Sequence, residues 1–188
     1  MPEQKRISAP ALLFILSILG LSLTGCFYLA PLDQDIEEQP YPPTINMLTG
    51  TDPPVGMLSL NLNEGGKHQF LVSDFDDPNL DDTLYWRWIV DYGTMVAASF
   101  PMSVLPSQRE DARLSFDFTA CDSIYIANVT EGKTVVVYIV LSDSQFTNHG
   151  QSFRGDQIQI PFETQSETSS PIWASWTVQF KGSCPASN

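Results

Sequence analysis

The segment Leu84-Tyr-Trp-Arg-Trp-Ile-Val-Asp91 decides the fold class, because its large apolar side chains recur at every second position. A period of two places alternate side chains on opposite faces of an extended strand. One face of this segment carries Leu84, Trp86, Trp88 and Val90, and the other carries Arg87 and Asp91. We therefore predict a β-strand whose aromatic face lies in a core, within a fold built from strands.

Five further segments have the composition of strands, namely residues 57–63, 114–118, 134–141, 157–162 and 172–180. Residues 134–141 are nearly all apolar, which is typical of a strand buried on both faces. Clusters of Gly, Asn and Asp separate these segments, and the chain beyond the N-terminal region lacks the 3.6-residue period of amphipathic helices. Roughly seven to nine short strands in one chain predict an all-β fold, an antiparallel sandwich of two sheets.

Residues 1–25 are predicted to form a helical secretory signal peptide that is cleaved from the mature protein. Lys5 and Arg6 form a basic start. The apolar run of 13 residues from Ala11 to Leu23 is shorter than the roughly 20 residues of a membrane-spanning helix. A basic start, a short apolar run and small residues at its end describe a signal peptide.

Leu23-Thr24-Gly25-Cys26 follows this run directly and resembles a bacterial lipobox. The resemblance implies cleavage before Cys26 and acylation of its sulfur, and two or three acyl chains anchor a protein firmly to a membrane. Phe27 stands where an Asp often marks retention at the inner membrane, which favours lipid anchoring at the outer membrane of a bacterial envelope. The alternative is an ordinary signal peptide in which Cys26 is incidental.

The mature chain divides into a tether and one domain. Residues 26–43 are acidic and rich in proline, without apolar periodicity, and are predicted to be extended. Residues 44–188 hold the predicted strands. The chain has 9 Lys and Arg against 22 Asp and Glu, a formal charge of −13. Removing the signal takes away one acid and two bases and makes the charge −14. Such a charge argues against a nucleic-acid partner.

The three cysteines divide into one lipidation site and one pair. If Cys26 is acylated, Cys121 and Cys184 remain, and a disulfide is the default for an even pair in an exported protein. The alternatives are a reactive thiol, which lacks a basic partner nearby in the sequence, and a metal site, for which two isolated cysteines are a weak basis.

Two segments resemble immunoglobulin-like modules of bacterial surface proteins. They are Asp76-Asp-Pro-Asn-Leu-Asp-Asp-Thr-Leu-Tyr-Trp-Arg-Trp-Ile-Val-Asp91 and Val135-Val-Val-Tyr-Ile-Val-Leu-Ser-Asp143. Polycystic-kidney-disease-type and cadherin-like repeats have similar acidic loops before a tryptophan-bearing strand. The resemblance implies an immunoglobulin-like β-sandwich. The two cysteines depart from antibody domains, because their positions predict a bridge at the C-terminal end of the sandwich rather than across its core.

An acidic run from Asp74 to Asp82 is the strongest polar cluster in the sequence, and its oxygen-bearing side chains suit a hard cation such as Ca²⁺. It matches only the first half of a calcium loop, because Asp82 stands where glycine belongs and Trp88 where the bidentate glutamate belongs. The alternative is a solvated turn in which carboxylates accept backbone N–H groups. The candidate ligands are Asp74, Asp76, Asp77, Asn79, Asp81 and Asp82.

Signatures of catalysis are sparse, and we predict that the protein is not an enzyme and needs no cofactor other than the calcium considered above. The two histidines, His68 and His149, belong to no metal-binding spacing, and no nucleophile elbow or phosphate loop occurs. Trp173 and Trp176 are three residues apart and cannot both face inward on a regular strand. One of them is therefore a candidate for an exposed binding surface.

These observations predict a membrane-anchored envelope lipoprotein with a non-catalytic binding or structural domain, whose partner is an envelope protein or a glycan. The first alternative is a calcium-dependent adhesion or polysaccharide-binding module that uses residues 74–82. The second is a hydrolase whose site is assembled from scattered acids.

Overall fold

The computed structural model describes residues 41–122, 129–167 and 169–185. All of them belong to the compact unit Pro40–Asn188. This unit is built almost entirely of strands joined by turns and four short 3₁₀ helices, so the all-β prediction is confirmed.

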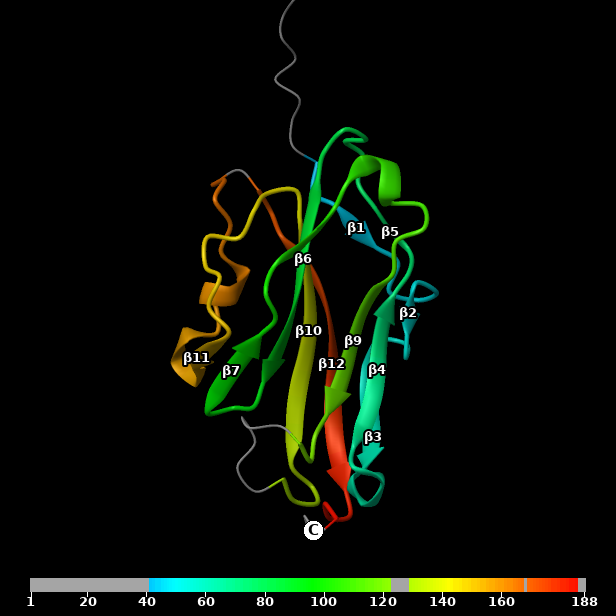
Figure 1. Cartoon of the computed structure of the whole chain (residues 1–188), viewed down its shortest axis with the longest axis vertical. Helices are drawn as coiled ribbons and strands as arrows, with labels where there is room; N and C mark the ends of the chain where they lie inside the picture. The colour runs from blue at the N-terminus through cyan, green and yellow to red at the C-terminus, as the bar shows by residue number, and fades with distance from the viewer. Residues whose placement is uncertain (1–40, 123–128, 168, 186–188) are drawn as a thin grey trace, which may run out of the picture. The chain divides into compact units, whose positions relative to one another are not determined.

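A large sheet forms one layer of the domain. Its strand order is β11 (Ser152–Arg154), β7 (Met95–Ala98), β6 (Leu84–Asp91), β10 (Thr134–Ser142), β12 (Ile172–Lys181) and β3 (Gly56–Asn61). The short strand β8 (Met102–Val104) also pairs with β6. The pairs are antiparallel except for one: β3, the first long strand of the chain, runs parallel to β12, the last strand (Figure 1).

A smaller sheet forms the second layer, in the order β2 (Thr51–Asp52), β4 (Lys67–Val72) and β9 (Leu114–Thr119). A two-residue pair, β1 (Thr44–Ile45) with β5 (Phe75–Asp76), lies beside these layers in Figure 1. The central trio β6–β10–β12 in one sheet and the pair β4–β9 in the other match the arrangement of immunoglobulin-like sandwiches.

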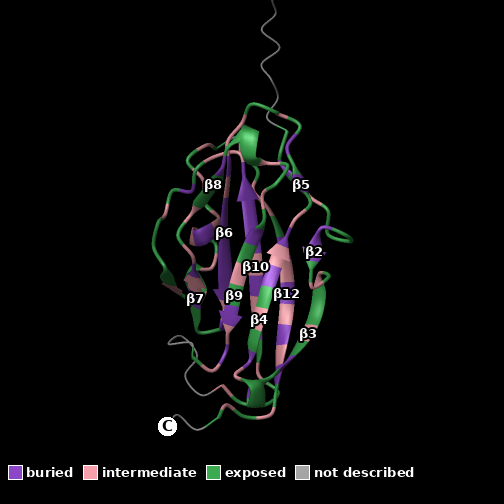
Figure 2. Cartoon of the chain, turned by 45° about the vertical axis from the view of Figure 1, so that its right-hand side comes forward, coloured by how far each residue is buried: buried purple, intermediate pink, exposed green. Residues whose placement is uncertain are grey.

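The main core lies between the two sheets and is rich in aromatic rings. Phe70 of β4 contacts both Trp88 of β6 and Trp176 of β12, with ring centroids 6.2 and 5.2 Å apart. The predicted burial of Trp86 and Trp88 is confirmed, and Figure 2 shows β6 and β10 buried along most of their length. The Trp176 indole N–H donates to the Pro53 carbonyl at 2.8 Å, which ties β12 to the segment before β3.

A second, smaller core covers the outer face of the large sheet. Ile89 of β6, Val96 of β7 and Val140 of β10 pack there against Phe146 from the segment after β10. The prediction that residues 134–141 are buried on both faces is therefore confirmed, because this strand supplies side chains to both cores. Arg87 lies on the outer face as its alternation predicts, but it is fully buried.

Residues 157–162 are predicted to form a strand, and this prediction is wrong. The segment contains the end of η3 (Gly155–Gln157) and all of η4 (Ile160–Phe162), two 3₁₀ helices. Pro161 has no N–H to donate to a sheet ladder, which disfavours a paired strand. Its apolar residues serve the second core instead, where Phe162 packs edge-on against Tyr138 with ring centroids 5.8 Å apart.

A third 3₁₀ helix, η1 (Leu62–Glu64), lies in the turn between β3 and β4. Gly65 and Gly66 follow it with φ values of 84° and 58°, the left-handed region that favours glycine. A Cβ on Gly66 would lie 2.7 Å from the Ala120 side chain, so this turn also needs glycine for close approach. The fourth 3₁₀ helix is η2 (Pro106–Gln108), between β8 and β9.

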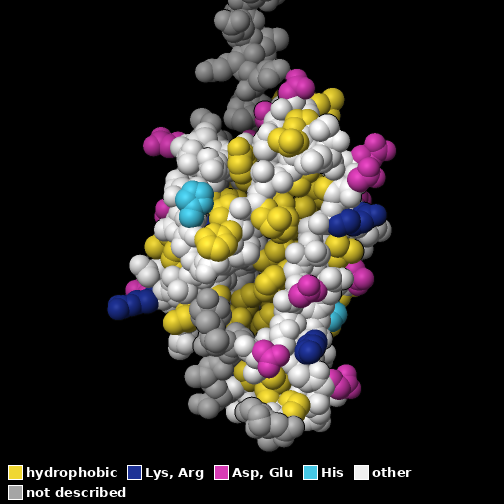
Figure 3. Space-filling model, in the orientation of Figure 1, with side chains coloured by type: hydrophobic (Ala, Val, Ile, Leu, Met, Phe, Trp, Pro, Cys, Tyr) yellow, Lys and Arg dark blue, Asp and Glu magenta, His cyan; other side chains and the backbone are white. Residues whose placement is uncertain are grey.

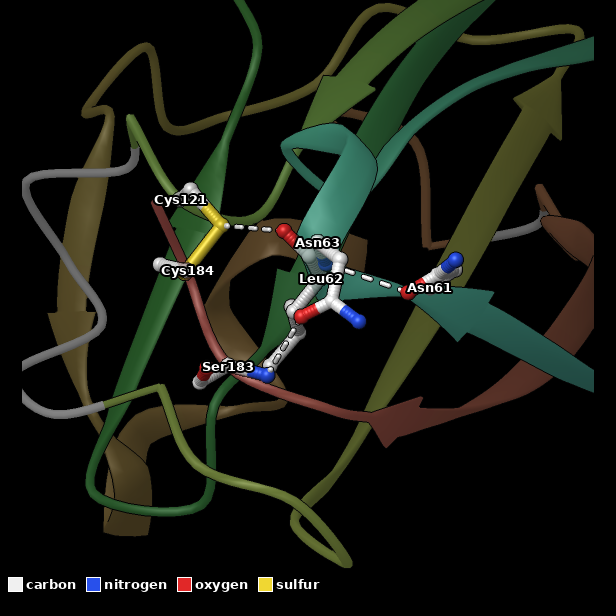
Figure 4. Close-up of a disulfide and its surroundings, with 6 residues drawn as sticks. All are labelled: Asn61, Leu62, Asn63, Cys121, Ser183 and Cys184. Carbon is white, nitrogen blue, oxygen red and sulfur yellow. Dashed lines mark hydrogen bonds between the residues drawn. A yellow bond between two sulfur atoms is a disulfide. The ribbon is translucent and has the colours of Figure 1, made fainter. Parts of the chain in front are cut away.

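The predicted disulfide between Cys121 and Cys184 is confirmed, with its sulfurs 2.10 Å apart. It joins the residues after β9 to the residues after β12, at the C-terminal end of the sandwich (Figure 4). Cys121 Sγ lies 3.6 Å from the Leu62 carbonyl oxygen, and the Ser183 N–H donates to Asn63 Oδ1 at 3.2 Å. The bridge therefore holds η1, β9 and the C-terminal segment together.

Candidate functional site

One long side of the sandwich is open. β9 is the last strand of the small sheet, and in residues 41–122, 129–167 and 169–185 no strand pairs with its outer edge. Across from that edge lie β6 and β7 of the large sheet. We call the space between β9 and these two strands the open-side groove. Figure 3 shows hydrophobic side chains gathered in a band down the middle of this face, between the positions of β7 and β9 in Figure 1.

Two hollows follow one another along the open-side groove. The first, of about 370 Å³, has Trp88 and Val90 of β6 on one wall and Phe116 and Phe118 of β9 on the other. The second, of about 440 Å³, is bounded by Trp86 of β6 and Leu114 of β9, with further residues from β8 and η2. Because the wall residues advance together along both strands, the groove follows the length of β9.

Aromatic stacking holds the floor of the first hollow. The rings of Trp88 and Phe116 stack 5.5 Å apart at an angle of 19°. Trp88 also contacts Trp176 behind it, at a centroid distance of 5.7 Å. The indole N–H groups of Trp86 and Trp88 are buried without an acceptor, whereas the indole N–H of Trp176 has one. Packing alone therefore holds the two indoles of the groove.

Negative charge marks the rim of the groove. Asp117 and Asp122 line the first hollow, and both side chains are exposed. The Asp117 carboxylate accepts a hydrogen bond from Gln69 Nε2 at 2.9 Å across the β4–β9 pair. Asp111 and Arg113 line the second hollow, and both are exposed. The groove is therefore apolar at its floor and acidic beside the first hollow.

The six candidate calcium ligands do not converge on one point. Asp74 accepts a hydrogen bond from Asn46 Nδ2 at 2.8 Å, and Asp76 accepts one from the Asp77 N–H at 2.8 Å. Asp77 is fully buried and accepts from the Asn79 N–H at 2.8 Å, while Asp81 is exposed. Three of these carboxylates therefore accept N–H groups from within or near the loop, as the turn interpretation expects.

Arg109 donates hydrogen bonds to the backbone of the acidic loop. Its guanidinium donates to the carbonyl oxygens of Asp77, Asn79 and Asp82, at 3.4 and 3.2 Å for the first two. In the part of the chain that the structure describes, no group of three or more His, Cys, Asp or Glu side chains is placed to hold a metal ion. The geometry therefore gives the calcium hypothesis no support.

Burial affects the pKa of one carboxyl group of the loop, that of Asp77. The pKa of Asp77 is raised above its ordinary value, mainly because burial disfavours the charged carboxylate. The hydrogen bond from Asn79 and the charge of Arg109 act in the opposite direction, and Asp82 and Asp143 raise the pKa further. The second carboxylate oxygen of Asp77 is buried without a hydrogen-bond partner.

Trp173 and Trp176 differ in burial, as their spacing predicts. Trp176 is fully buried, whereas 52% of the Trp173 surface is exposed. Trp173 borders a hollow of about 560 Å³ on the outer face, where Phe162 meets its ring edge-on at 5.8 Å. Tyr138, Gln159, Ser169 and Ser170 also line this hollow, which we call the Trp173 hollow.

The histidines are placed separately. His68 of β4 packs edge-on against Phe70 at 5.0 Å, and burial lowers the pKa of its imidazole against the opposing charge of Asp52. His149 is exposed in the turn before β11. Neither histidine lines the open-side groove or the Trp173 hollow.

Sequence reasoning does not find the open-side groove. The alternation of Leu114, Phe116 and Phe118 predicts that β9 has one buried face, and that is confirmed for Leu114 and Phe118. A local pattern does not tell which strand lies beside β9 or that one of its edges has no partner, because strand neighbours are chosen by residues far apart in the chain.

Cys26 lies outside the described residues, so its acylation stays a prediction. In the described ranges no helix is long and apolar enough to cross a membrane. No protein-family model, curated protein or solved structure matches this chain.

Proposed function

We propose that this chain is a non-catalytic lipoprotein, anchored to the outer membrane, which binds another component of the cell envelope through the open-side groove. The observation that carries the proposal is the groove itself, an aromatic-lined cleft beside a strand whose outer edge pairs with no described strand. Concave sites with an apolar lining and a few polar groups are typical of binding sites. The lipobox resemblance supports the anchor, and the acidic stretch that follows supports a tether.

Site-specific cross-linking on intact cells tests the binding role. A photo-reactive benzoyl-phenylalanine at Thr119, which lines the first hollow, is expected to capture a discrete partner. The matched control carries the same group at Met57, which is 75% exposed on β3 and does not line the groove. The proposal fails if both positions give the same adducts or if the groove position gives none.

Fractionation of cell membranes tests the anchor. We expect Cys26→Ser to move the protein from the membrane to the soluble fraction, because the acylated sulfur is lost. Phe27→Asp is the matched variant, since it leaves the cysteine intact. In an enteric host it is expected to keep the protein membrane-bound but shift it to the inner membrane. An unchanged membrane fraction for Cys26→Ser would contradict the lipid anchor.

The Trp173 hollow favours polysaccharide binding as a second candidate function. A half-exposed indole beside serine, glutamine and tyrosine side chains offers both a stacking surface and hydrogen-bonding groups for a sugar ring. Co-sedimentation with purified peptidoglycan is the test. We expect Trp173→Ala to weaken retention about tenfold and Trp173→Phe to weaken it less. Equal retention of all three proteins would exclude this hollow as the binding site.

A further inference from the structure

The outer edge of β9 is a template for another strand. A strand at the edge of a sheet presents a row of unpaired backbone N–H and C=O groups, which an extended peptide can pair with. β9 pairs with β4 through all six of its residues, Leu114–Thr119, so the strand has a regular backbone along its length, and no described strand pairs with its other edge. The two hollows of the groove border β9 at Leu114 and from Phe116 to Thr119.

The groove has the period of a strand. Its walls advance by two residues at each step, through Trp86, Trp88 and Val90 on β6. Side chains on one face of an extended peptide are about 6.6 Å apart, the same spacing as these wall residues on their own strand. A peptide that adds to β9 therefore presents every second side chain to the successive hollows, and apolar side chains at those positions match the lining.

Charge selects the intervening positions of such a peptide. Asp117 and Asp122 are exposed beside the first hollow, and Asp117 points away from the core on β9. A residue opposite Asp117 on an added strand lies on the same outward face, where an opposite charge stabilises the pair. Lys or Arg is therefore favoured at the outward positions, and Asp or Glu is disfavoured.

We infer that the open-side groove binds an extended segment of another envelope protein as a fourth strand of the small sheet, with apolar residues alternating with lysine or arginine. This inference rests on the proposed function and names the chemistry of its partner. The acidic rim argues for a basic partner rather than for a second copy of this chain, whose own formal charge is −13.

The test uses the whole protein, purified in detergent, and the capped peptide Lys-Val-Lys-Val-Lys-Val-Lys, with tryptophan emission as the readout. Two derivatives are N-methylated, one on the valines and the other on the central lysines. Because alternate N–H groups of a strand point to opposite edges, strand addition predicts that only one of the two derivatives loses affinity, by about tenfold or more. The matched acidic peptide, Glu-Val-Glu-Val-Glu-Val-Glu, is expected to bind at least tenfold more weakly.

Charge variants of the protein locate the site. We expect Asp117→Asn with Asp122→Asn to weaken binding of the lysine peptide roughly three- to tenfold, because the two negative charges beside the first hollow are lost. Glu163→Gln with Glu167→Gln is the matched control, since both residues are exposed and neither lines the groove. That control is expected to bind within about twofold of the unaltered protein at low salt.

Several results would overturn the inference. Equal affinity of both N-methylated peptides would mean that side chains bind without backbone pairing. Absence of peptide binding, together with a discrete adduct from Thr119 in the cross-linking experiment, would refute strand addition and leave the proposed function standing. Sedimentation showing a dimer that the peptide does not dissociate would assign the edge to a second copy. Tighter binding of a synthetic peptide of residues 27–39 would assign it to this chain's own tether.

Discussion

Asp77 is the residue at which burial and charge conflict most directly. Its side chain is fully buried, one carboxylate oxygen accepts the Asn79 N–H, and the other has no hydrogen-bond partner. Burial raises its pKa. A carboxyl whose pKa is higher in the folded than in the unfolded state binds protons more tightly when folded. The free energy of unfolding therefore falls as the pH rises from its unfolded pKa near 4 through the folded pKa.

We expect Asp77→Asn to remove this pH dependence. The amide oxygen can still accept the Asn79 N–H, and no buried charge remains, so the variant is expected to gain stability relative to the unaltered protein as the pH rises above about 4. Urea denaturation at several pH values between 3 and 7 measures the difference. Asp81→Asn is the exposed control and is expected to change stability by less than about 0.5 kcal/mol. Parallel pH profiles for Asp77→Asn and the unaltered protein would contradict the argument.

Arg87 of β6 connects its strand to two other segments, the residues after β7 and the turn before β11. Its guanidinium donates to the Ser99 carbonyl after β7, at 3.2 and 2.9 Å. It also donates to the carbonyls of Asn148 and Gly150 in the turn before β11, at 2.7 and 2.9 Å. The carbon at its centre lies 5.5 Å from the centroid of the Phe146 ring. Burial lowers the pKa of Arg87 to about 10, which leaves the side chain charged at neutral pH.

Arg87→Met is expected to lower the free energy of unfolding by about 3 kcal/mol, because the carbonyl groups of Ser99, Asn148 and Gly150 lose a charged donor. Arg87→Lys is expected to recover only part of this loss, since an ammonium group lacks the planar fork of donors. Chemical denaturation measures both losses. Arg113→Met is the control, because Arg113 is exposed. Equal losses for Arg87→Met and Arg113→Met would show that the carbonyl contacts add nothing to stability.

Arg109 donates to three carbonyl groups of the loop of residues 74–82. Because the guanidinium occupies the carbonyl oxygens of Asp77, Asn79 and Asp82, we expect neither calcium nor EDTA to change the Tm. Arg109→Met is expected to lower the Tm by several degrees, because those carbonyls lose their donor. Calorimetry of the protein with each additive checks both expectations. A rise in Tm with calcium would revive the calcium hypothesis.

At the scale of the whole domain, the disulfide joins the ends of the two sheets. Cys121 and Cys184 are 63 residues apart, and a crosslink that closes such a loop stabilises the fold by about 4 kcal/mol through the entropy of the unfolded chain. We expect Cys121→Ser with Cys184→Ser to lose stability of this order in urea denaturation. Dithiothreitol is expected to destabilise the unaltered protein to the same extent and to leave the double variant unchanged. A destabilising effect of the reductant on the double variant would contradict the assignment.

The strands that could be predicted from the sequence are those in which apolar side chains either alternate or follow one another without interruption. The alternation in β6 and the continuous apolar run in β10 lead directly to their observed burial. The pattern at residues 157–162 misleads, because Ile158, Ile160 and Phe162 alternate like a strand although they belong to 3₁₀ turns that cover the outer face. Alternation reports which side chains are apolar, and Pro161 shows that it does not report whether the backbone is paired.

The candidate binding sites could also be predicted only in part. The sequence predicts that one of Trp173 and Trp176 is exposed, because residues three apart on a regular strand lie on opposite faces. It does not identify the open-side groove, because the groove exists only where β9 ends one sheet and β6 and β7 face it from the other. It also does not predict that Arg109, which comes 27 residues after Asp82, occupies the acidic loop.

By itself the sequence determined the β class of this protein, the aromatic face of β6 and the pairing of Cys121 with Cys184. These follow from the period of the backbone and from the number of cysteines left after Cys26, both of which are local or countable. Only the tertiary structure decided that Asp77 and Arg87 are buried and that no described strand pairs with the outer edge of β9. Those features depend on which distant segments pack together, and pairing across the chain is set by the whole core.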